Sequence, residues 1–206
     1  MVIVDAVRKS IGIMLNPGKE SKKKMSVAES LTLYYKMAIV PIILSIIFGF
    51  AASMVLGTQY KSLVTNDAAF GAIRGFSAAI LISLFVFAIL IEPICLLVSA
   101  FIVQLVGGPL LQTFKGTFEN TYAAFIYAAM PLILFIFLAA TLNPLAIFVY
   151  LILSVWSVVV LIIALANQQK ISRLASLCIL ILSSIVSMIL YMIIIFGFAA
   201  IVASSI

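Results

Sequence analysis

Long apolar runs separated by short polar connections dominate the sequence after residue 36. The runs cover residues 37–56, 76–106, 122–142, 145–166 and 174–203. A helix rises about 1.5 Å per residue, so about 20 apolar residues cross the hydrocarbon core of a bilayer, which is about 30 Å thick. The pattern therefore predicts an all-α protein whose residues 37–206 form a polytopic transmembrane helix bundle of about five spans.

The first 36 residues follow a different pattern. Apolar side chains recur there at helical spacing, with charged residues off the stripe: Val4, Val7, Ile11, Met14 and Leu15. This stripe predicts a short amphipathic helix over residues 1–15 that lies in the membrane interface. Asn16-Pro17 ends it, and a basic linker then leads to Ser26 and Glu29, whose spacing is that of a capping box. We therefore expect residues 1–36 to form a basic, amphipathic N-terminal segment, with a new helix starting near Ser26.

The run over residues 76–106 is too long for one straight crossing. Pro93 cannot donate a backbone hydrogen bond, so Glu92-Pro93 near its middle predicts a kink. Glu92 is also the one acid well inside an apolar run, where an ionised group costs at least about 2.5–3.5 kcal/mol. It is either a protonated or hydrogen-bonded kink residue, or the proton or cation site of a small transporter or channel component. Gly107-Gly108-Pro109 is expected to end the run.

Small residues recur every four positions in the first span, at Gly49, Ser53 and Gly57. This spacing lets helix backbones approach closely in lipid, so the three residues are predicted helix-packing positions. The contact is either internal or a homodimer seam. Ser183 and Ser187 form a weaker version of the pattern in the fifth span.

Composition explains why lipid must be the solvent. Hydrophobic residues make up 66% of the 206 residues and charged residues only 9%, against roughly half and a quarter in soluble domains. Histidine is absent, and we find no catalytic constellation or phosphate-binding loop, so we expect no catalytic residue, cofactor, metal site or enzyme activity. Cys95 and Cys178 lie in apolar runs, which predicts small buried hydrophobic side chains.

Charge sets the expected orientation. Seven of the twelve Lys and Arg residues precede the first span, and five spans would place ten basic residues on the N-terminal side against two on the other. The positive-inside rule then puts the N-terminus in the cytoplasm and the C-terminus outside. Lys19, Lys22, Lys23 and Lys24 are expected to contact anionic lipid headgroups, or only to set this topology. Membrane lipids are thus the expected partners, with a protein partner or homo-oligomer also possible, and no nucleic acid.

The stretch from Leu96 to Leu177 resembles the membrane domain of the Yip family, the Ypt-interacting membrane proteins. Its motifs are, in chain order, Gly107-Gly108, Phe114, Tyr127-Ala128-Ala129-Met130-Pro131, Trp156 and Ile171-Ser172-Arg173-Leu174-Ala175. The order at the N-terminus, Asn16-Pro17, a basic linker and a helix entering the first span, is similar too. The aspartate–leucine–tyrosine–glycine–proline motif of eukaryotic members is missing and the N-terminal segment is short, so the chain is more similar to prokaryotic members.

This resemblance implies a non-enzymatic membrane protein that organises lipids or binds partner proteins in the cell membrane of a prokaryote. Gly107, Gly108, Tyr127 and Pro131 are its family-like positions. A transporter or channel component centred on Glu92 is the alternative function.

Overall fold

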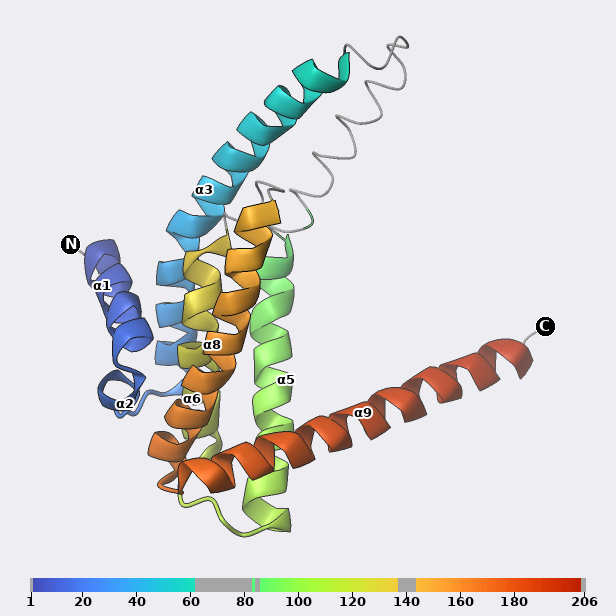
Figure 1. The fold of residues 1–206 in the computed structure, drawn as a ribbon. Helices are drawn as coiled ribbons and strands as arrows, with labels where there is room; N and C mark the ends of the chain where they lie inside the picture. Colours follow the sequence, from blue (N-terminus) through green and yellow to red (C-terminus); the bar gives the residue numbers. More distant parts are fainter. Residues whose placement is uncertain (1, 62–82, 84–85, 137–143, 205–206) are drawn as a thin grey trace.

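The computed structural model describes residues 2–61, 83, 86–136 and 144–204, and this part of the chain is helical without a strand (Figure 1). The elements are, in order, α1 (Val2–Leu15), α2 (Pro17–Glu20), α3 (Val27–Lys61), the π-helix η1 (Phe87–Ile91), α5 (Glu92–Leu105), the π-helix η2 (Val106–Leu110), α6 (Phe118–Leu134), α8 (Pro144–Gln169) and α9 (Arg173–Ser204). Four stretches of these elements are long and apolar enough to cross a membrane: Val27–Phe48, Phe87–Leu110, Leu145–Gln169 and Arg173–Ile193. With α6 they make a helical membrane bundle of about five spans, which confirms the predicted fold class.

Helix α6 forms the centre of the bundle. It packs against α8, α3, α5 and α1, and the residues from Asn120 to Pro131 are buried. Four of these residues are alanines, which let the neighbouring helix backbones come close. Ser157 of α8 donates a hydrogen bond from its Oγ to the Ala128 carbonyl, which ties α8 to α6.

Helix α3 begins where its sequence predicts. The Ser26 N–H donates to Glu29 Oε2 at 2.9 Å, and the Glu29 N–H donates to Ser26 Oγ at 3.2 Å, so the capping box is confirmed. The helix runs without interruption from Val27 to Lys61. Pro41 therefore lies inside a long helix and not in the first turn of a span that begins at residue 37. The helix-packing prediction for Gly49, Ser53 and Gly57 concerns side chains outside the described part.

The second predicted run is irregular at two places. A π-helix occupies Phe87–Ile91, immediately before Glu92 and Pro93, where the kink is predicted. The second π-helix carries the chain through Gly107, Gly108 and Pro109 to Leu110. The helical path therefore ends a few residues later than the predicted stop. Residues 76–82, 84 and 85 of the run lie outside the described residues.

Helix α9 leaves the bundle soon after it begins. Lys170 takes a positive φ of 56°, and the Ile171 N–H bonds back to the Ala166 carbonyl at 3.0 Å, which closes the turn after α8. From this turn α9 runs away from the other helices at a steep angle (Figure 1). Six consecutive side chains from Met188 to Ile193 are exposed, so this part of α9 has no covered face.

Both cysteines are exposed, Cys95 on α5 and Cys178 on α9, so the prediction that they are buried is wrong. Lipid solvates apolar side chains, and an apolar run therefore does not tell which of its residues face the protein.

Candidate functional site at the polar end of the bundle

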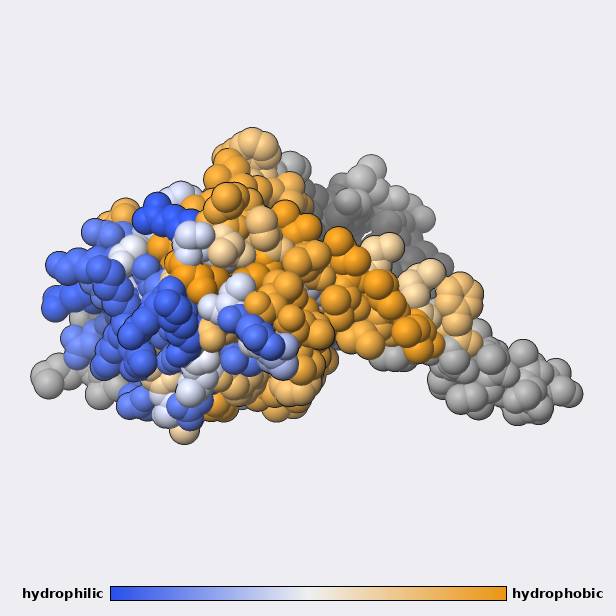
Figure 2. All heavy atoms as spheres, turned by 90° about the horizontal axis from the view of Figure 1, so that it is seen from below, coloured by the Kyte–Doolittle hydropathy of each residue, from blue (hydrophilic) through white to orange (hydrophobic). Residues whose placement is uncertain are grey.

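Among the described residues, polar and charged side chains gather at one end of the bundle. Here α2, the linker over residues 21–26, η2, the start of α6 and the turn between α8 and α9 meet; we call this the polar end. Viewed from this side, hydrophilic residues gather on one part of the described surface and hydrophobic residues on the neighbouring part (Figure 2).

The backbone of the basic linker is held by amide side chains at the end of α8. Asn167 Nδ2 donates to the Gly18 carbonyl at 3.1 Å and to Ser21 Oγ at 2.9 Å. Gln168 Nε2 donates to the carbonyls of Ser21 at 2.6 Å and Lys23 at 2.8 Å. Buried backbone groups need such partners, because an unpaired one carries a desolvation penalty. The linker is therefore docked through its backbone.

The four predicted headgroup-contact lysines project from this docked backbone. Their side chains are all exposed, at Lys19, Lys22, Lys23 and Lys24. Beside them is a cavity of about 290 Å³ lined mainly by polar residues of the linker and the start of α6, among them Lys24 and Glu119. The positive charges thus form a surface on a rigid support.

Helix α1 forms over the predicted residues. One face of it packs on the bundle and another face stays exposed. Ser10 and Ile13 are buried against α3 and α6. Ile11 and Leu15, which belong to the predicted apolar stripe, remain 46% and 80% exposed. The bundle therefore covers a neighbouring face of α1 and leaves these stripe residues available to lipid. Trp156 of α8 donates from Nε1 to the Met14 carbonyl at 3.1 Å and anchors the end of α1.

Lys9 differs from the linker lysines because it points inward. Its Nζ lies 5.5 Å from the centre of the Tyr127 ring and 3.7 Å from Met25 Sδ. Burial lowers the pKa of Lys9 from its ordinary value, and the positive charge of Lys23 lowers it further. The arrangement is a cation–π contact that joins α1 to α6. Lys9 therefore acts in packing and is not part of the headgroup surface.

A second network joins the connection before α6 to the end of α8. The Gly116 N–H donates to Gln169 Oε1 at 2.8 Å, and Gln169 Nε2 donates to Thr121 Oγ1 at 2.7 Å. Thr121 Oγ1 in turn donates to Gln104 Oε1 at 2.5 Å. Gln169 and Thr121 are fully buried. Three elements, α5, α6 and α8, are thus locked together by one amide side chain.

Gly107 gives the chain room to turn back over the end of α5. Its carbonyl accepts the N–H groups of Thr113 at 2.9 Å and Phe114 at 3.0 Å, so the Phe114 ring lies directly over it. A Cβ on Gly107 would lie 2.5 and 2.6 Å from Cε1 and Cε2 of that ring, closer than atoms can approach. At Gly108 the nearest atom would be Gln104 Nε2 at 3.5 Å, an ordinary contact.

A family model described as the Yip1 domain matches residues 11–204. The chain belongs to the Yip1 family. Searches of curated proteins and of solved structures gave no significant match. The predicted membership of the Yip family is confirmed.

Of the predicted family-like positions, Gly107, Gly108 and Tyr127 lie at or near the polar end. Tyr127 is fully buried and donates from its Oη to the Lys23 carbonyl at 3.0 Å, which adds a third hydrogen-bonding side chain to the two amides that hold the linker. Pro131 is buried one turn later in α6. The Gly107 carbonyl accepts the Phe114 N–H, and the Phe114 ring lies over Gly107. Sequence reasoning missed Asn167, Gln168 and Gln169; three consecutive amides directly after a long apolar run were the available signal.

Glu92 lies away from the polar end, beside α3. The Tyr34 Oη is 2.6 Å from the Ala88 carbonyl and 3.1 Å from Glu92 Oε2. A tyrosine hydroxyl has a single proton, so Tyr34 shares it between these two acceptors, and the bond to the Ala88 carbonyl is the shorter. The Tyr35 Oη donates to the Ile89 carbonyl at 3.2 Å.

The two tyrosines explain how the irregular helix before Pro93 is tolerated. In the π-helix the Glu92 N–H bonds to the Phe87 carbonyl, which frees the Ala88 carbonyl from its usual partner. Pro93 has no N–H to offer the Ile89 carbonyl. Tyr34 and Tyr35 bond to these two carbonyls, so Glu92 is not needed for this purpose.

Proposed function

We propose that this Yip1 protein is a non-enzymatic membrane organiser that gathers anionic lipids, or binds a partner protein, at its polar end. The observation that carries the proposal is that α2 and the linker are held through their backbone while four lysine side chains project from them. Each such lysine near an anionic surface contributes about 1 kcal/mol. Because the backbone is already ordered, less conformational entropy is lost when a headgroup or an acidic protein surface binds.

In this proposal the polar end faces the cytoplasm of a prokaryotic cell, and the C-terminus lies outside. The excess of basic residues on the N-terminal side supports this orientation. Ser21 is fully buried, so a labelling site belongs at the neighbouring exposed Lys22. A Lys22→Cys variant without native cysteines should react with an impermeant reagent only after the cells are opened, and reaction in intact cells would reverse the orientation.

We expect the variant Lys19→Gln, Lys22→Gln, Lys23→Gln, Lys24→Gln to lose its preference for anionic lipid. The measurement uses the whole protein in vesicles and energy transfer from Trp156, the one tryptophan, to a dansyl-labelled anionic or zwitterionic lipid. In the unmodified protein, transfer to the anionic lipid should be the greater and should decrease with salt, because screening weakens charge contacts.

The matched control compares single variants, Lys22→Gln and Lys61→Gln. Lys61 is the last residue of α3, at the end opposite the linker, so only Lys22→Gln should reduce the transfer from Trp156 to lipid labelled in the polar-end leaflet. Transfer that is equal for both lipids and insensitive to salt would remove the lipid part of the proposal. Binding of an acidic protein that is lost in the quadruple variant would then support the partner-binding form.

Transport through Glu92 is the second candidate function, and the half-buried contact with Tyr34 is the observation on which it depends. Glu92 lines neither the 290 Å³ cavity at the polar end nor the larger groove between α9 and the bundle. We expect Glu92→Gln to keep the fold and to change the free energy of unfolding by less than about 1 kcal/mol, since an amide can keep one hydrogen bond. Melting in detergent and proton flux in vesicles are the measurements. Protein-dependent flux that disappears in a folded Glu92→Gln variant would favour transport.

A further inference from the structure

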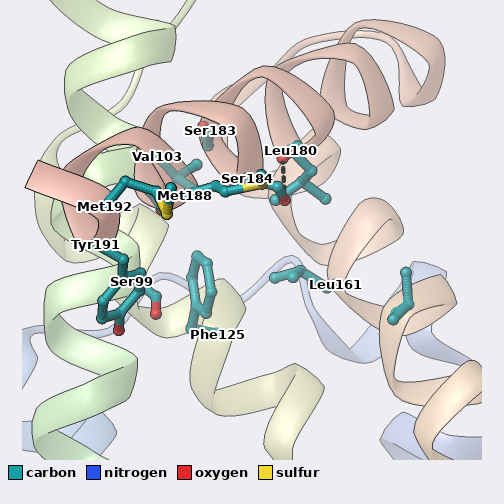
Figure 3. A pocket seen from close by; sticks show the side chains of 12 residues that line it. Ser99, Val103, Phe125, Leu161, Leu180, Ser183, Ser184, Met188, Tyr191 and Met192 are labelled. Atoms are coloured by element: carbon teal, nitrogen blue, oxygen red, sulfur yellow. Dashed lines mark hydrogen bonds between the residues drawn. The ribbon is translucent and has the colours of Figure 1, made fainter. Parts of the chain in front are cut away.

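A groove opens where α9 leaves the bundle. It has a volume of about 560 Å³ and is walled by α5, α6, α8 and α9. The Phe125 ring rises from α6 toward Met188 of α9, and Ser99 of α5 lies beside Tyr191 (Figure 3). α9 touches α5, η2 and α8 and then diverges (Figure 1), so the groove is a wedge that no described segment fills.

The lining is apolar with a few hydroxyl groups, and one of these groups lacks a partner. Ser183 is 3% exposed, and no described group accepts or donates a hydrogen bond at its Oγ. Its neighbour Ser184 instead donates to the Leu180 carbonyl of its own helix at 2.8 Å, as serines in apolar helices commonly do. An unpaired hydroxyl in an apolar site is costly, so Ser183 indicates a polar atom supplied from outside the chain.

The depth of the groove points to a lipid. Leu161, which lines it, lies eight residues before Gln169, the last residue of α8, or about 12 Å below the polar end at about 1.5 Å per residue. Each headgroup layer of a bilayer is about 5–8 Å thick outside a core of about 30 Å. The groove therefore lies just beneath the headgroups, at the level of the ester groups and upper acyl chains. Exposed Lys170 and Arg173 occupy the same end of the bundle.

The size of the groove distinguishes a lipid tail from a second copy of the protein. A helix with its side chains is about 10–12 Å wide, so a single turn would take up about 500 Å³. The groove would hold little more than one turn. Its volume instead falls within the range of about 300–1,000 Å³ that small apolar ligands occupy.

We propose that this groove binds one acyl chain of a glycerophospholipid from the leaflet at the polar end, with an ester oxygen accepting the hydrogen bond of Ser183. This proposal rests on the proposed lipid-organising function and deepens it. The lysines bind the headgroup of the lipid, and the groove binds its tail. One lipid is then stably bound to the protein, in addition to the surrounding anionic lipids that the lysines attract.

The test uses the full-length protein in vesicles that contain a phospholipid with a photoreactive diazirine on its acyl chain. After irradiation, labelled peptides are mapped. Val158 lines the groove but is 54% exposed, so Val158→Trp should fill the groove without displacing a core residue. Val155 is one turn earlier in the same helix, is 69% exposed and does not line the groove, so Val155→Trp is the matched control.

We expect labelling of the groove walls around Phe125 and Met188 to fall at least fivefold in Val158→Trp and to be unchanged in Val155→Trp. Ser183→Ala should lower it about twofold or more, and Ser184→Ala should not. If Val158→Trp does not fold, Met188→Trp at another exposed groove position replaces it. Equal labelling of the two Trp variants, or label spread evenly over the lipid-facing surface, would overturn the proposal, as would protein–protein cross-links through the groove.

The quadruple lysine variant separates this proposal from the headgroup function. Groove labelling that persists in that variant supports the tail site even when the anionic preference is absent. If the unmodified protein prefers anionic lipid but shows no groove labelling, the tail site alone is refuted.

Discussion

Gln169→Leu should lower the free energy of unfolding by about 2–3 kcal/mol, because the Gly116 N–H would lose its partner and the buried Thr121 Oγ1 would keep only its bond to Gln104. The leucine fills a similar volume but offers no partner to the Gly116 N–H or to Thr121 Oγ1. Each buried polar group left unpaired costs about 1–3 kcal/mol. The measurement is the unfolding midpoint in detergent, followed through the fluorescence of Trp156, which lies on the same helix.

The control for this variant is Gln112→Leu. Gln112 lies exposed in the connection between η2 and α6, which also contains Gly116. The substitution therefore makes the same chemical change without burying an unpaired group. We expect a change below about 0.5 kcal/mol, as for most surface substitutions. Similar losses for the two variants would show that the buried network does not hold the three helices together.

Gly107→Ala should have the second largest effect, a loss of about 1–3 kcal/mol through overpacking. The new methyl group would overlap the Phe114 ring, which packs on the hydrophobic core. The ring cannot move without loosening the return of the chain toward α6. Unfolding in detergent measures the loss, and accessibility of a cysteine introduced at Lys115 reports whether the connection has opened.

Gly108→Ala provides the comparison, one residue further along the same π-helix. Its methyl group would make an ordinary contact, and alanine is favoured over glycine in helices by about 0.5–1 kcal/mol. We therefore expect no loss, and a small gain is possible. Adding Phe114→Leu to Gly107→Ala should recover part of the stability, because a smaller side chain leaves room for the methyl group. Equal effects of the two alanine variants would contradict the steric explanation.

The sequence was a good guide to features that depend on neighbouring residues. The apolar runs predicted the helices, the pair Ser26 and Glu29 predicted the start of α3, and Glu92-Pro93 predicted the place where the helix becomes irregular. Each of these follows from local hydrogen bonding or from the solubility of a segment in lipid. The family resemblance likewise depended on short motifs that are legible in the chain itself.

The features that the sequence did not reveal depend on which face of an apolar helix meets protein. The length and apolar character of the two runs do not distinguish α6, whose residues 120–131 are all buried, from α9, whose later residues are exposed. In water the buried face is the apolar one, but in lipid both faces are apolar. Cys95 and Cys178 were misplaced for this reason, and the role of Asn167, Gln168 and Gln169 depends on segments more than 100 residues away or on other helices.

Because the basic linker docks through its backbone, its position on the bundle does not depend on its surface charge. Asn167 and Gln168 bond to carbonyl groups and to Ser21, whereas the lysine side chains take no part in these bonds. A carbonyl is the same whichever side chain its residue carries. The charges at positions 19, 22, 23 and 24 can therefore be removed or reversed without unseating the segment, so the surface could acquire a preference for a different lipid or protein while the scaffold stays as it is.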